Sequence, residues 1–241
     1  MVIPQPVLSI IIPVFNEETK IDADLEAALD YFDRQPYNFE LIVVDDGSRD
    51  RTPALLDAWL ERKGPRLRAI CYRPNRGKGH AVRTGMLAAA GQVRMFADAG
   101  LCVPFSDTAA GLAAIERGCD LAIGSRKLAG SRVVRPQAAY RRWGSSLFGA
   151  LARGLMGLQG ISDTQCGFKL YTARAAETLF GRSRIDGFMF DAETLIAARR
   201  LGMKIAEFPV HWRADPDSRY RPLAGSLRNL IELARIRFGS P

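Results

Sequence analysis

The chain has 241 residues, 47% of them hydrophobic and 25% charged, which is enough apolar material for one large α/β domain. Four cysteines without a C-x-x-C spacing and only two histidines argue against a structural zinc site and a disulfide framework, and favour a reducing, cytoplasmic compartment. The net charge of +8 favours an anionic partner. No signal peptide and no apolar run of about 18 residues is visible, so we expect no membrane-spanning segment.

Apolar runs alternate with segments of helical periodicity along most of the chain. Strands are predicted at residues 8–15, 41–44, 67–72, 93–97 and 121–124. Helices are predicted at 21–32, from about 52 with Pro53 in the first turn, at 79–90 and at 106–117. Beyond residue 160 the pattern loosens, with short elements at 168–171 and 205–212. We therefore expect a Rossmann-like α/β fold with a mixed, mainly parallel sheet flanked by helices. The pattern changes near Gly124, but we expect the residues before and after this point to share one sheet.

Polar residues follow the predicted strands. In parallel sheets, ligands bind at the carboxyl ends of the strands. The residues at those ends are Asn16-Glu17, Asp45-Asp46, Arg73 to Gly79, Asp98 and Ser125-Arg126. We expect the binding site at this edge of the sheet.

The string Asp45-Asp46-Gly47-Ser48 is the most informative of these. Two carboxylates at a strand end can accept hydrogen bonds from a base N–H and from ribose hydroxyls, while Gly47 permits a tight turn. The alternative is turn and helix-cap chemistry alone, with Ser48 or Asp50 capping the next helix. That alternative explains Gly47 but not two adjacent carboxylates, whose charges repel each other.

Two further strings suit a diphosphate. Residues 75–79, Asn-Arg-Gly-Lys-Gly, resemble a phosphate-facing loop before a helix, although the spacing is not that of a Walker A loop. Asp98, at the end of a buried strand, offers oxygen ligands for Mg²⁺ or Mn²⁺. The alternative for Asp98 is a helix or turn cap.

A basic tract follows. Between Leu121 and Ser162 there is no Asp or Glu. The cations of this tract are Arg126, Lys127, Arg132, Arg135, Arg141, Arg142 and Arg153. The tract is suited to phosphates or acidic lipid headgroups, and the alternative is a solvated basic surface. Asp163 and Asp191 lie beyond this tract and add carboxylates to the candidate site. The alternative for Asp191 and Glu193 is that they simply occupy the first turn of a helix, where its dipole favours them.

Taken together, these strings resemble family 2 glycosyltransferases of fold type A, in particular the dolichyl-phosphate β-glucosyltransferases and related polyprenyl-phosphate enzymes. The strings that match, in family order, are residues 10–17, 43–48, 75–79, the strand ending at Asp98, 124–126, 163–169, 190–191 and 209–212. The ordered set covers nearly the whole chain and is far more specific than any one string.

The resemblance implies roles for individual residues. Those expected around the nucleotide-sugar are Pro13, Phe15, Glu17, Asp45, Asp46, Lys78, Asp98, Ala99 and Arg219, the last in a late loop closing over the diphosphate. Asp98 is expected to hold Mg²⁺ or Mn²⁺. Arg126, Arg141 and Arg142 are expected at the acceptor phosphate, and Asp163, Asp191 and Arg126 at the reaction site.

The function implied is inverting transfer of a hexose, from UDP-glucose or next from GDP-mannose, to a polyprenyl or dolichyl phosphate at the cytoplasmic face of a membrane. An ionised phosphate acceptor needs no strong base; a hydroxyl acceptor would need Asp163 or Asp191 as one. We expect a single domain, 1–241, in which 1–124 bind the donor and 125–222 the acceptor. Residues 223–241 are expected to form an amphipathic helix, either on the membrane surface or packed on the domain itself.

One departure from the family pattern keeps alternatives open. Where the family has Asp-x-Asp, this chain has Asp98-Ala99-Gly100. Either another carboxylate such as Asp163 assists Asp98, or the metal binds more weakly, or the protein binds a nucleotide-sugar without catalysis. A second alternative is an enzyme acting on a saccharide hydroxyl. No nucleic-acid-reading motif is present, and the sequence does not determine the oligomeric state.

Overall fold

The structure, a computed structural model, describes residues 5–135, 157–214, 232 and 236. Its strands are β1 (Leu8–Val14), β2 (Phe39–Asp45), β3 (Leu67–Cys71), β4 (Val93–Ala97), β5 (Leu121–Ser125), β6 (Arg132–Arg135), β7 (Phe168–Thr172), β8 (Ile205–Pro209) and β9 (His211–Arg213). Its helices are α1 (Ile21–Phe32), α2 (Thr52–Lys63), α3 (Lys78–Ala88), α4 (Thr108–Glu116), α6 (Ala173–Arg182) and α7 (Phe190–Arg200), with short 3₁₀ turns η1 (Gly64–Arg66) and η2 (Phe105–Asp107).

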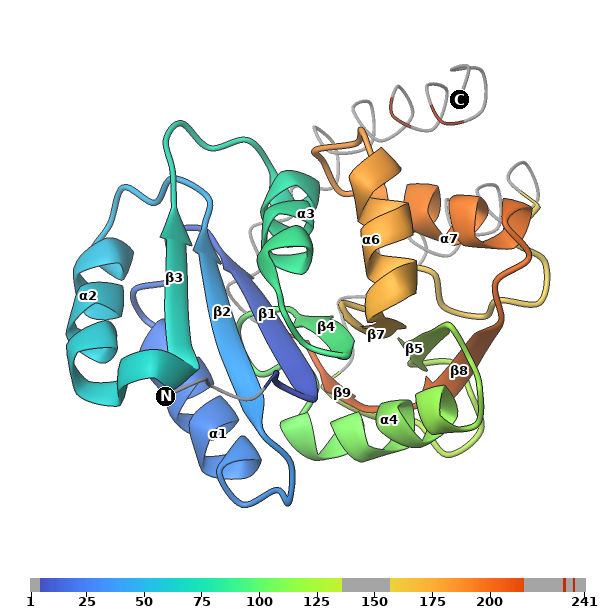
Figure 1. The fold of residues 1–241 in the computed structure, drawn as a ribbon, viewed down its shortest axis with the longest axis horizontal. Coiled ribbons are helices and arrows are strands. Elements are labelled where there is room, and N and C mark those ends of the chain that lie inside the picture. Colours follow the sequence, from blue (N-terminus) through green and yellow to red (C-terminus); the bar gives the residue numbers. More distant parts are fainter. Residues whose placement is uncertain (1–4, 136–156, 215–231, 233–235, 237–241) are drawn as a thin grey trace.

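A seven-stranded sheet in the order β3-β2-β1-β4-β7-β5-β8 forms the centre of the molecule (Figure 1). All its strands are parallel except β7, which runs antiparallel to its neighbours β4 and β5. The prediction of a mixed, mainly parallel sheet is confirmed. Strands from before and after Gly124 share this sheet.

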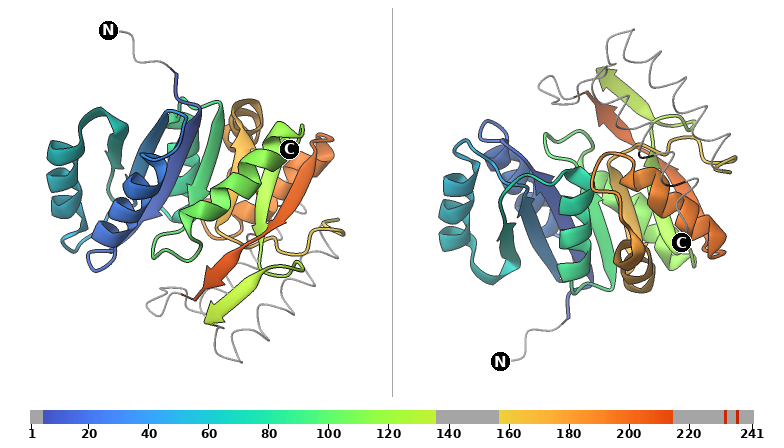
Figure 2. Two further views of the ribbon diagram at one scale, coloured as in Figure 1. Left: turned by 90° about the horizontal axis from the view of Figure 1, so that it is seen from below. Right: turned by 90° about the horizontal axis from the view of Figure 1, so that it is seen from above.

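Helices cover both faces of the sheet. Alternate side chains of β1 face opposite cores: Ile10 and Ile12 pack with α1, α2 and α4, whereas Ile11 packs with α3, α6 and α7. Figure 2 shows these two helical layers from opposite sides. Because both faces of the sheet are buried, the strands are continuously apolar instead of alternating between apolar and polar residues. This explains the apolar runs from which the strands were predicted.

The segment predicted at 205–212 is divided between two sheets. β8 pairs with β5 in the large sheet, while β9 leaves it and pairs with β6 in a separate two-stranded sheet. Pro209 ends β8, and the buried Val210 lies between the two strands. Similarly, the helix predicted at 106–117 consists of η2 followed by α4.

This topology brings the predicted polar residues to one edge. Since β1, β2, β3, β4, β5 and β8 are parallel, all their carboxyl ends lie at the same edge of the sheet. None of the helices that the structure describes combines the length and the apolar character needed to cross a bilayer.

Candidate active site

The carboxylates at the end of β2 fasten the neighbouring loops. Asp45 and Asp46 are both 3% exposed. Asp45 accepts a hydrogen bond from the Ser48 N–H at 3.0 Å. Asp46 accepts from the N–H groups of Arg76 and Gly77, each at 2.8 Å, and from the Asn75 side chain at 2.7 Å. Asp46 therefore fixes the loop that leads into α3.

That loop presents Lys78, the first residue of α3, to the end of β4. The Lys78 Nζ lies 2.6 Å from an Asp98 carboxylate oxygen. Burial lowers the pKa of Lys78, but the nearby carboxylates of Asp98 and Asp191 outweigh it, and the net shift is upward. Lys78 is therefore a charged ammonium group held beside the proposed metal ligand.

Asp98 rests on a glycine of the segment before β7. Its N–H donates to the Gly167 carbonyl at 2.9 Å. A Cβ at Gly167 would lie 2.0 Å from an Asp98 carboxylate oxygen, so a larger residue there would displace the carboxylate. The close approach explains why a glycine stands at this position.

Arg126, one residue beyond β5, is held by Asp163. The Arg126 Nε and Nη2 donate to the two Asp163 oxygens at 2.6 and 2.8 Å, and the Arg126 N–H donates at 3.1 Å. Burial raises the pKa of Asp163, but the hydrogen bonds and charge of Arg126 outweigh it and bring the pKa down to about 2. Asp163 is therefore a weak base that orients the guanidinium group.

A second, buried ion pair lies beneath these groups. The Lys169 Nζ donates to the Asp191 carboxylate and to the carbonyl oxygens of Thr164 and Cys166, at 3.1 and 2.8 Å. Burial raises the pKa of Asp191, against the opposing charges of Lys169 and Lys78. Asp191 occupies the first turn of α7, as the simpler interpretation of its sequence predicted. The pair holds the segment on which Asp98 rests.

The groups form a continuous series along the edge. Asp46 binds the loop that carries Lys78, and Lys78 pairs with Asp98. Burial lowers the pKa of Arg126, but the hydrogen bonds and charge of Asp163 outweigh it, and the charge of Asp98 adds a smaller upward contribution. Sequence positions from the ends of β2, β4 and β5 therefore meet in one charged site rather than on separate faces.

The remaining predicted residues lie at the end of β1, beside Asp98 or outside the described part. Pro13 is half-buried within β1, and Phe15 and Glu17 follow it, half-buried. Glu17 pairs with Lys20 at 2.7 Å, and its N–H donates to Thr52 Oγ1. Ala99 is half-buried beside Asp98. Arg141, Arg142 and Arg219 lie outside the described residues, as does the predicted C-terminal amphipathic helix except for Glu232 and Ile236, which are both helical.

The donor set for a divalent cation is small. Within residues 5–135 and 157–214, no group of three His, Cys, Asp or Glu side chains is arranged to hold a metal. Asp163 is engaged by Arg126 and Asp191 by Lys169. However, Mg²⁺ is commonly bound by one or two carboxylates together with substrate phosphates and water. Asp98 therefore fits a cation that is held jointly with a diphosphate.

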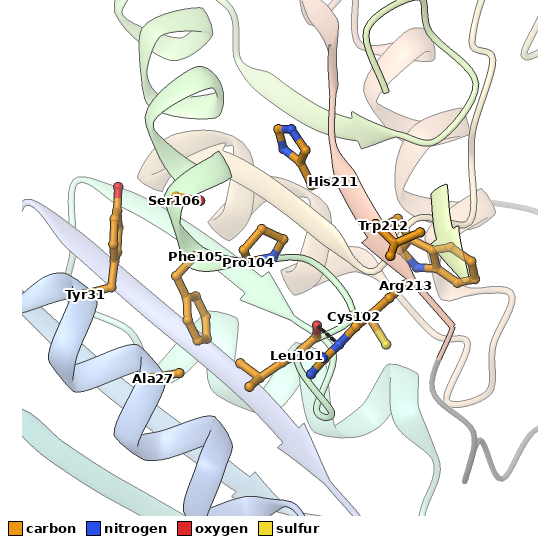
Figure 3. A pocket seen from close by; sticks show the side chains of 11 residues that line it. Ala27, Tyr31, Leu101, Cys102, Pro104, Phe105, Ser106, His211, Trp212 and Arg213 are labelled. Carbon is orange, nitrogen blue, oxygen red and sulfur yellow. Dashed lines mark hydrogen bonds between the residues drawn. The ribbon is translucent and has the colours of Figure 1, made fainter. Parts of the chain in front are cut away.

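An apolar pocket of about 460 Å³ opens beside this site (Figure 3). It is lined by Ala27, Tyr31, Leu101, Cys102, Pro104, Phe105, Ser106, Val134, His211, Trp212 and Arg213. Trp212 connects the pocket to the charged site, because the Arg126 guanidinium carbon lies 5.2 Å from the centroid of its ring. Val134, on β6, is 70% exposed. No sequence pattern predicted this pocket, since its walls come from four distant segments.

No role was predicted for two buried charged side chains, Lys169 and Asp24, although the sequence around each of them carries a signal. Lys169 stands between Phe168 and Leu170 in the buried strand β7, where a buried cation requires a partner. Asp24 lies on the buried face of α1, one residue before Leu25 and three after Ile21. A carboxylate on an apolar helix face is a signal of a buried hydrogen-bonding role.

Comparisons with known proteins identify the family and the fold of the chain. The sequence profile described as "Glycosyl transferase family 2" matches residues 9–180. The chain is 32% identical to the dolichyl-phosphate beta-glucosyltransferase of Dictyostelium discoideum, over 96% of this chain and 74% of that protein. It is 31% identical to the human dolichyl-phosphate beta-glucosyltransferase, over 97% of this chain and 76% of that protein.

Among solved structures, glucosyl-3-phosphoglycerate synthase from Mycobacterium tuberculosis has a similar fold. Its complex with phosphoglyceric acid superposes with a TM-score of 0.70 at 22% identity, covering 98% of this chain and 81% of that one. The complex of the same enzyme with Mn²⁺, UDP-glucose and phosphoglyceric acid gives a TM-score of 0.69. The predicted type A fold is thereby confirmed.

Proposed function

Because the chain belongs to glycosyl transferase family 2, we propose that it transfers a hexose from a nucleotide-sugar to a polyprenyl or dolichyl phosphate, with inversion at the anomeric carbon. UDP-glucose is the favoured donor and GDP-mannose the next. The relatives are dolichyl-phosphate beta-glucosyltransferases, which supports the acceptor, and the UDP-glucose complex of the structural neighbour supports the donor. We place the reaction at the inner face of a membrane, with residues 1–124 binding the donor and 125–222 the acceptor.

The donor's diphosphate binds at the ends of β2 and β4. Asp46 holds the loop in place, and Lys78 supplies a positive charge on the side of Asp98. A divalent cation held by Asp98 and the diphosphate would stabilise the negative charge on the leaving group. Lys78 supplies further stabilisation when its ammonium group passes from Asp98 to the departing phosphate.

The acceptor's phosphate binds at Arg126. An arginine has five N–H donors, and Asp163 accepts from the Nε and Nη2 groups, so the guanidinium keeps donors for a second anion while its orientation is fixed. This is the observation that carries the proposal: an arginine locked by a buried carboxylate next to Asp98. A phosphate oxygen is already ionised near neutrality and attacks without a base.

A hydroxyl acceptor is less well served by these residues. It must lose a proton during attack, which requires a carboxylate of suitable basicity. The pKa of Asp163 is about 2, and both of its oxygens are occupied by Arg126. The Asp191 carboxylate is 4% exposed and bonded to Lys169. Neither group is placed as the general base of such a reaction.

The pocket beside Trp212 is suited to the first part of the acceptor's isoprenoid chain. It begins where Arg126 packs on the Trp212 indole ring, and its walls also include Tyr31 and Phe105. The division at residue 124 therefore applies to the acceptor's phosphate, whereas its chain would also contact the donor-binding part. A lipid phosphate with its anionic head at Arg126 would thus find an apolar surface next to its first isoprene units. An anion with no apolar chain gains nothing from this pocket.

A transfer assay tests the proposed function. Protein is mixed with Mn²⁺ or Mg²⁺, radiolabelled UDP-glucose and a polyprenyl phosphate in detergent micelles, in parallel with labelled GDP-mannose and with saccharide acceptors. We expect label in an acid-labile lipid fraction. Label in saccharide with none in lipid would reject the lipid acceptor, and calorimetric binding of a nucleotide-sugar without turnover would identify a non-catalytic binding protein.

A further inference from the structure

The turn after β4 departs from the family in sequence and carries an unusual backbone. Gly100 stands where the second carboxylate of Asp-x-Asp is expected, and its φ is +90°. The next residue, Leu101, also has a positive φ of +49°. An L-residue with a side chain is strained at such angles, so the turn is built for glycine rather than for a carboxylate at position 100.

A carboxylate from another element reaches this turn. Asp24, in the first turn of α1, accepts the Gly100 N–H with both of its oxygens, at 2.8 and 3.0 Å, and the backbone of Leu101 also bonds to it. Its exposed fraction is 2%. Burying a carboxylate is costly unless hydrogen bonds compensate, and here the compensating donors are the amides of the turn itself.

Three further hydrogen bonds fix the same turn from other sides. Arg213 of β9 donates its Nε to the Leu101 carbonyl at 3.2 Å, as Figure 3 shows, and its N–H to the Cys102 carbonyl at 2.9 Å. Asp98, at the start of the turn, donates its N–H to the Gly167 carbonyl. The position of the Asp98 carboxylate therefore depends on a turn whose middle is bonded to Asp24.

We propose that Asp24 is a positioning residue that takes over the structural part of the missing second carboxylate. It acts from α1 through the Gly100 and Leu101 amides and holds the Asp98 turn in the shape that receives the diphosphate. It is not a metal ligand, because both of its oxygens are occupied by the Gly100 amide and the side chain is buried. This inference rests on the proposed function, since it assumes that a diphosphate binds at Asp98.

Nucleotide binding tests the proposal, with Asp24→Asn compared with Asp22→Asn. Both residues lie in the first turn of α1, but Asp22 points to α2, where it accepts from the Trp59 indole at 2.6 Å. Dissociation constants for UDP and for uridine are measured by calorimetry with Mn²⁺ present. Because asparagine lacks the charge and one of the two acceptor oxygens that hold the Gly100 amide, we expect Asp24→Asn to bind UDP about tenfold or more weakly, with uridine binding unchanged. Asp22→Asn is expected to bind both as the unaltered protein does.

A second variant, Gly100→Ala, keeps Asp24 but disfavours the positive φ, and the same selective loss of UDP affinity is expected. Unchanged UDP binding in Asp24→Asn, or an equal loss for UDP and uridine, would overturn the inference alone. If the unaltered protein binds neither UDP nor GDP, the proposed function fails and the inference fails with it.

Discussion

Two lysine–aspartate pairs lie next to each other in this protein and differ in exposure. The side chains of Lys169 and Asp191 are 0% and 4% exposed, whereas those of Lys78 and Asp98 are 21% and 33% exposed. The buried pair is saturated by backbone carbonyls and holds the segment that contains Gly167. The partly exposed pair can exchange its partners for a ligand. The same two residue types thus serve as support in one place and as binding site in the other.

Removing the lysine from each pair should give the largest difference in stability between two variants. Lys169→Met leaves the Asp191 carboxylate buried without its cation, and we expect a loss of about 3–5 kcal/mol in the free energy of unfolding. Lys78→Met, by contrast, should cost less than about 1 kcal/mol, because a partly exposed pair contributes little. Urea unfolding followed by circular dichroism measures both. Equal losses in the two variants would show that the pairs do not differ in this way.

The partly exposed pair should matter for catalysis instead. With Asp98→Asn we expect the rate of hexose transfer to fall about 10²–10³-fold, as when a group that stabilises developing charge is removed. The melting temperature should stay close to that of the unaltered protein. Initial rates with labelled nucleotide-sugar provide the measurement, and a variant that retains full activity would remove Asp98 from the site.

Arg126→Lys separates the acceptor side from the donor side. Lysine keeps the charge but cannot donate through two fixed nitrogens to Asp163, so its orientation is lost. We expect KM for the lipid phosphate to rise about tenfold, which corresponds to about 1.4 kcal/mol, while the Kd of UDP stays unchanged. A rise in the Kd of UDP with an unaltered KM for the lipid would reverse the assignment of the two sides.

Filling the apolar pocket should have a smaller effect. Ala27→Phe places a ring in the pocket from α1, and Ala58→Phe adds the same ring at an exposed position of α2 as a control. We expect Ala27→Phe to raise KM for a long-chain polyprenyl phosphate about 3- to 10-fold, with little change for a phosphate bearing a single isoprene unit. If both acceptors respond equally, the pocket does not bind the chain.

The pH dependence of stability gives the smallest predicted effect. Burial raises the pKa of Asp24 from 3.8 to about 6, with Glu17 adding to the rise and Lys20 and the turn amides opposing it. Since the folded protein holds this proton more tightly, the contribution of Asp24 is greatest below about pH 4 and is lost as the pH rises through about 6. We compare the melting temperature of the unaltered protein with that of Asp24→Asn at each pH. The unaltered protein should lose a few degrees relative to the variant between pH 5 and pH 7, at about 2–4 °C per kcal/mol. A difference that does not vary with pH would contradict this ionisation.

The sequence predicted the sheet better than it predicted the contacts of the site. Apolar runs such as 8–15 identify buried strands, and their alternation with helices implies parallel pairing. The direction of β7 could not be predicted, because a strand of five residues carries no signal of its orientation or of the strands beside it. Charged residues at strand ends were likewise visible from spacing alone.

The partners of those charged residues were not visible. Asp46 bonds to amides about 30 positions away and Asp163 to a guanidinium 37 positions away. Such contacts depend on the packing of loops, which periodicity does not describe. Asp24 shows the limit most clearly: its position on an apolar helix face was readable, but the turn that it binds lies 76 residues further along the chain.

A crystal structure with UDP and Mn²⁺ tests the central claim most directly. We predict an anomalous manganese peak at Asp98, and a diphosphate oxygen within hydrogen-bonding distance of the Lys78 Nζ in place of the present 2.6 Å contact with Asp98. UDP bound elsewhere, with the Lys78–Asp98 pair intact, would contradict the proposal that this pair exchanges partners to hold the leaving group.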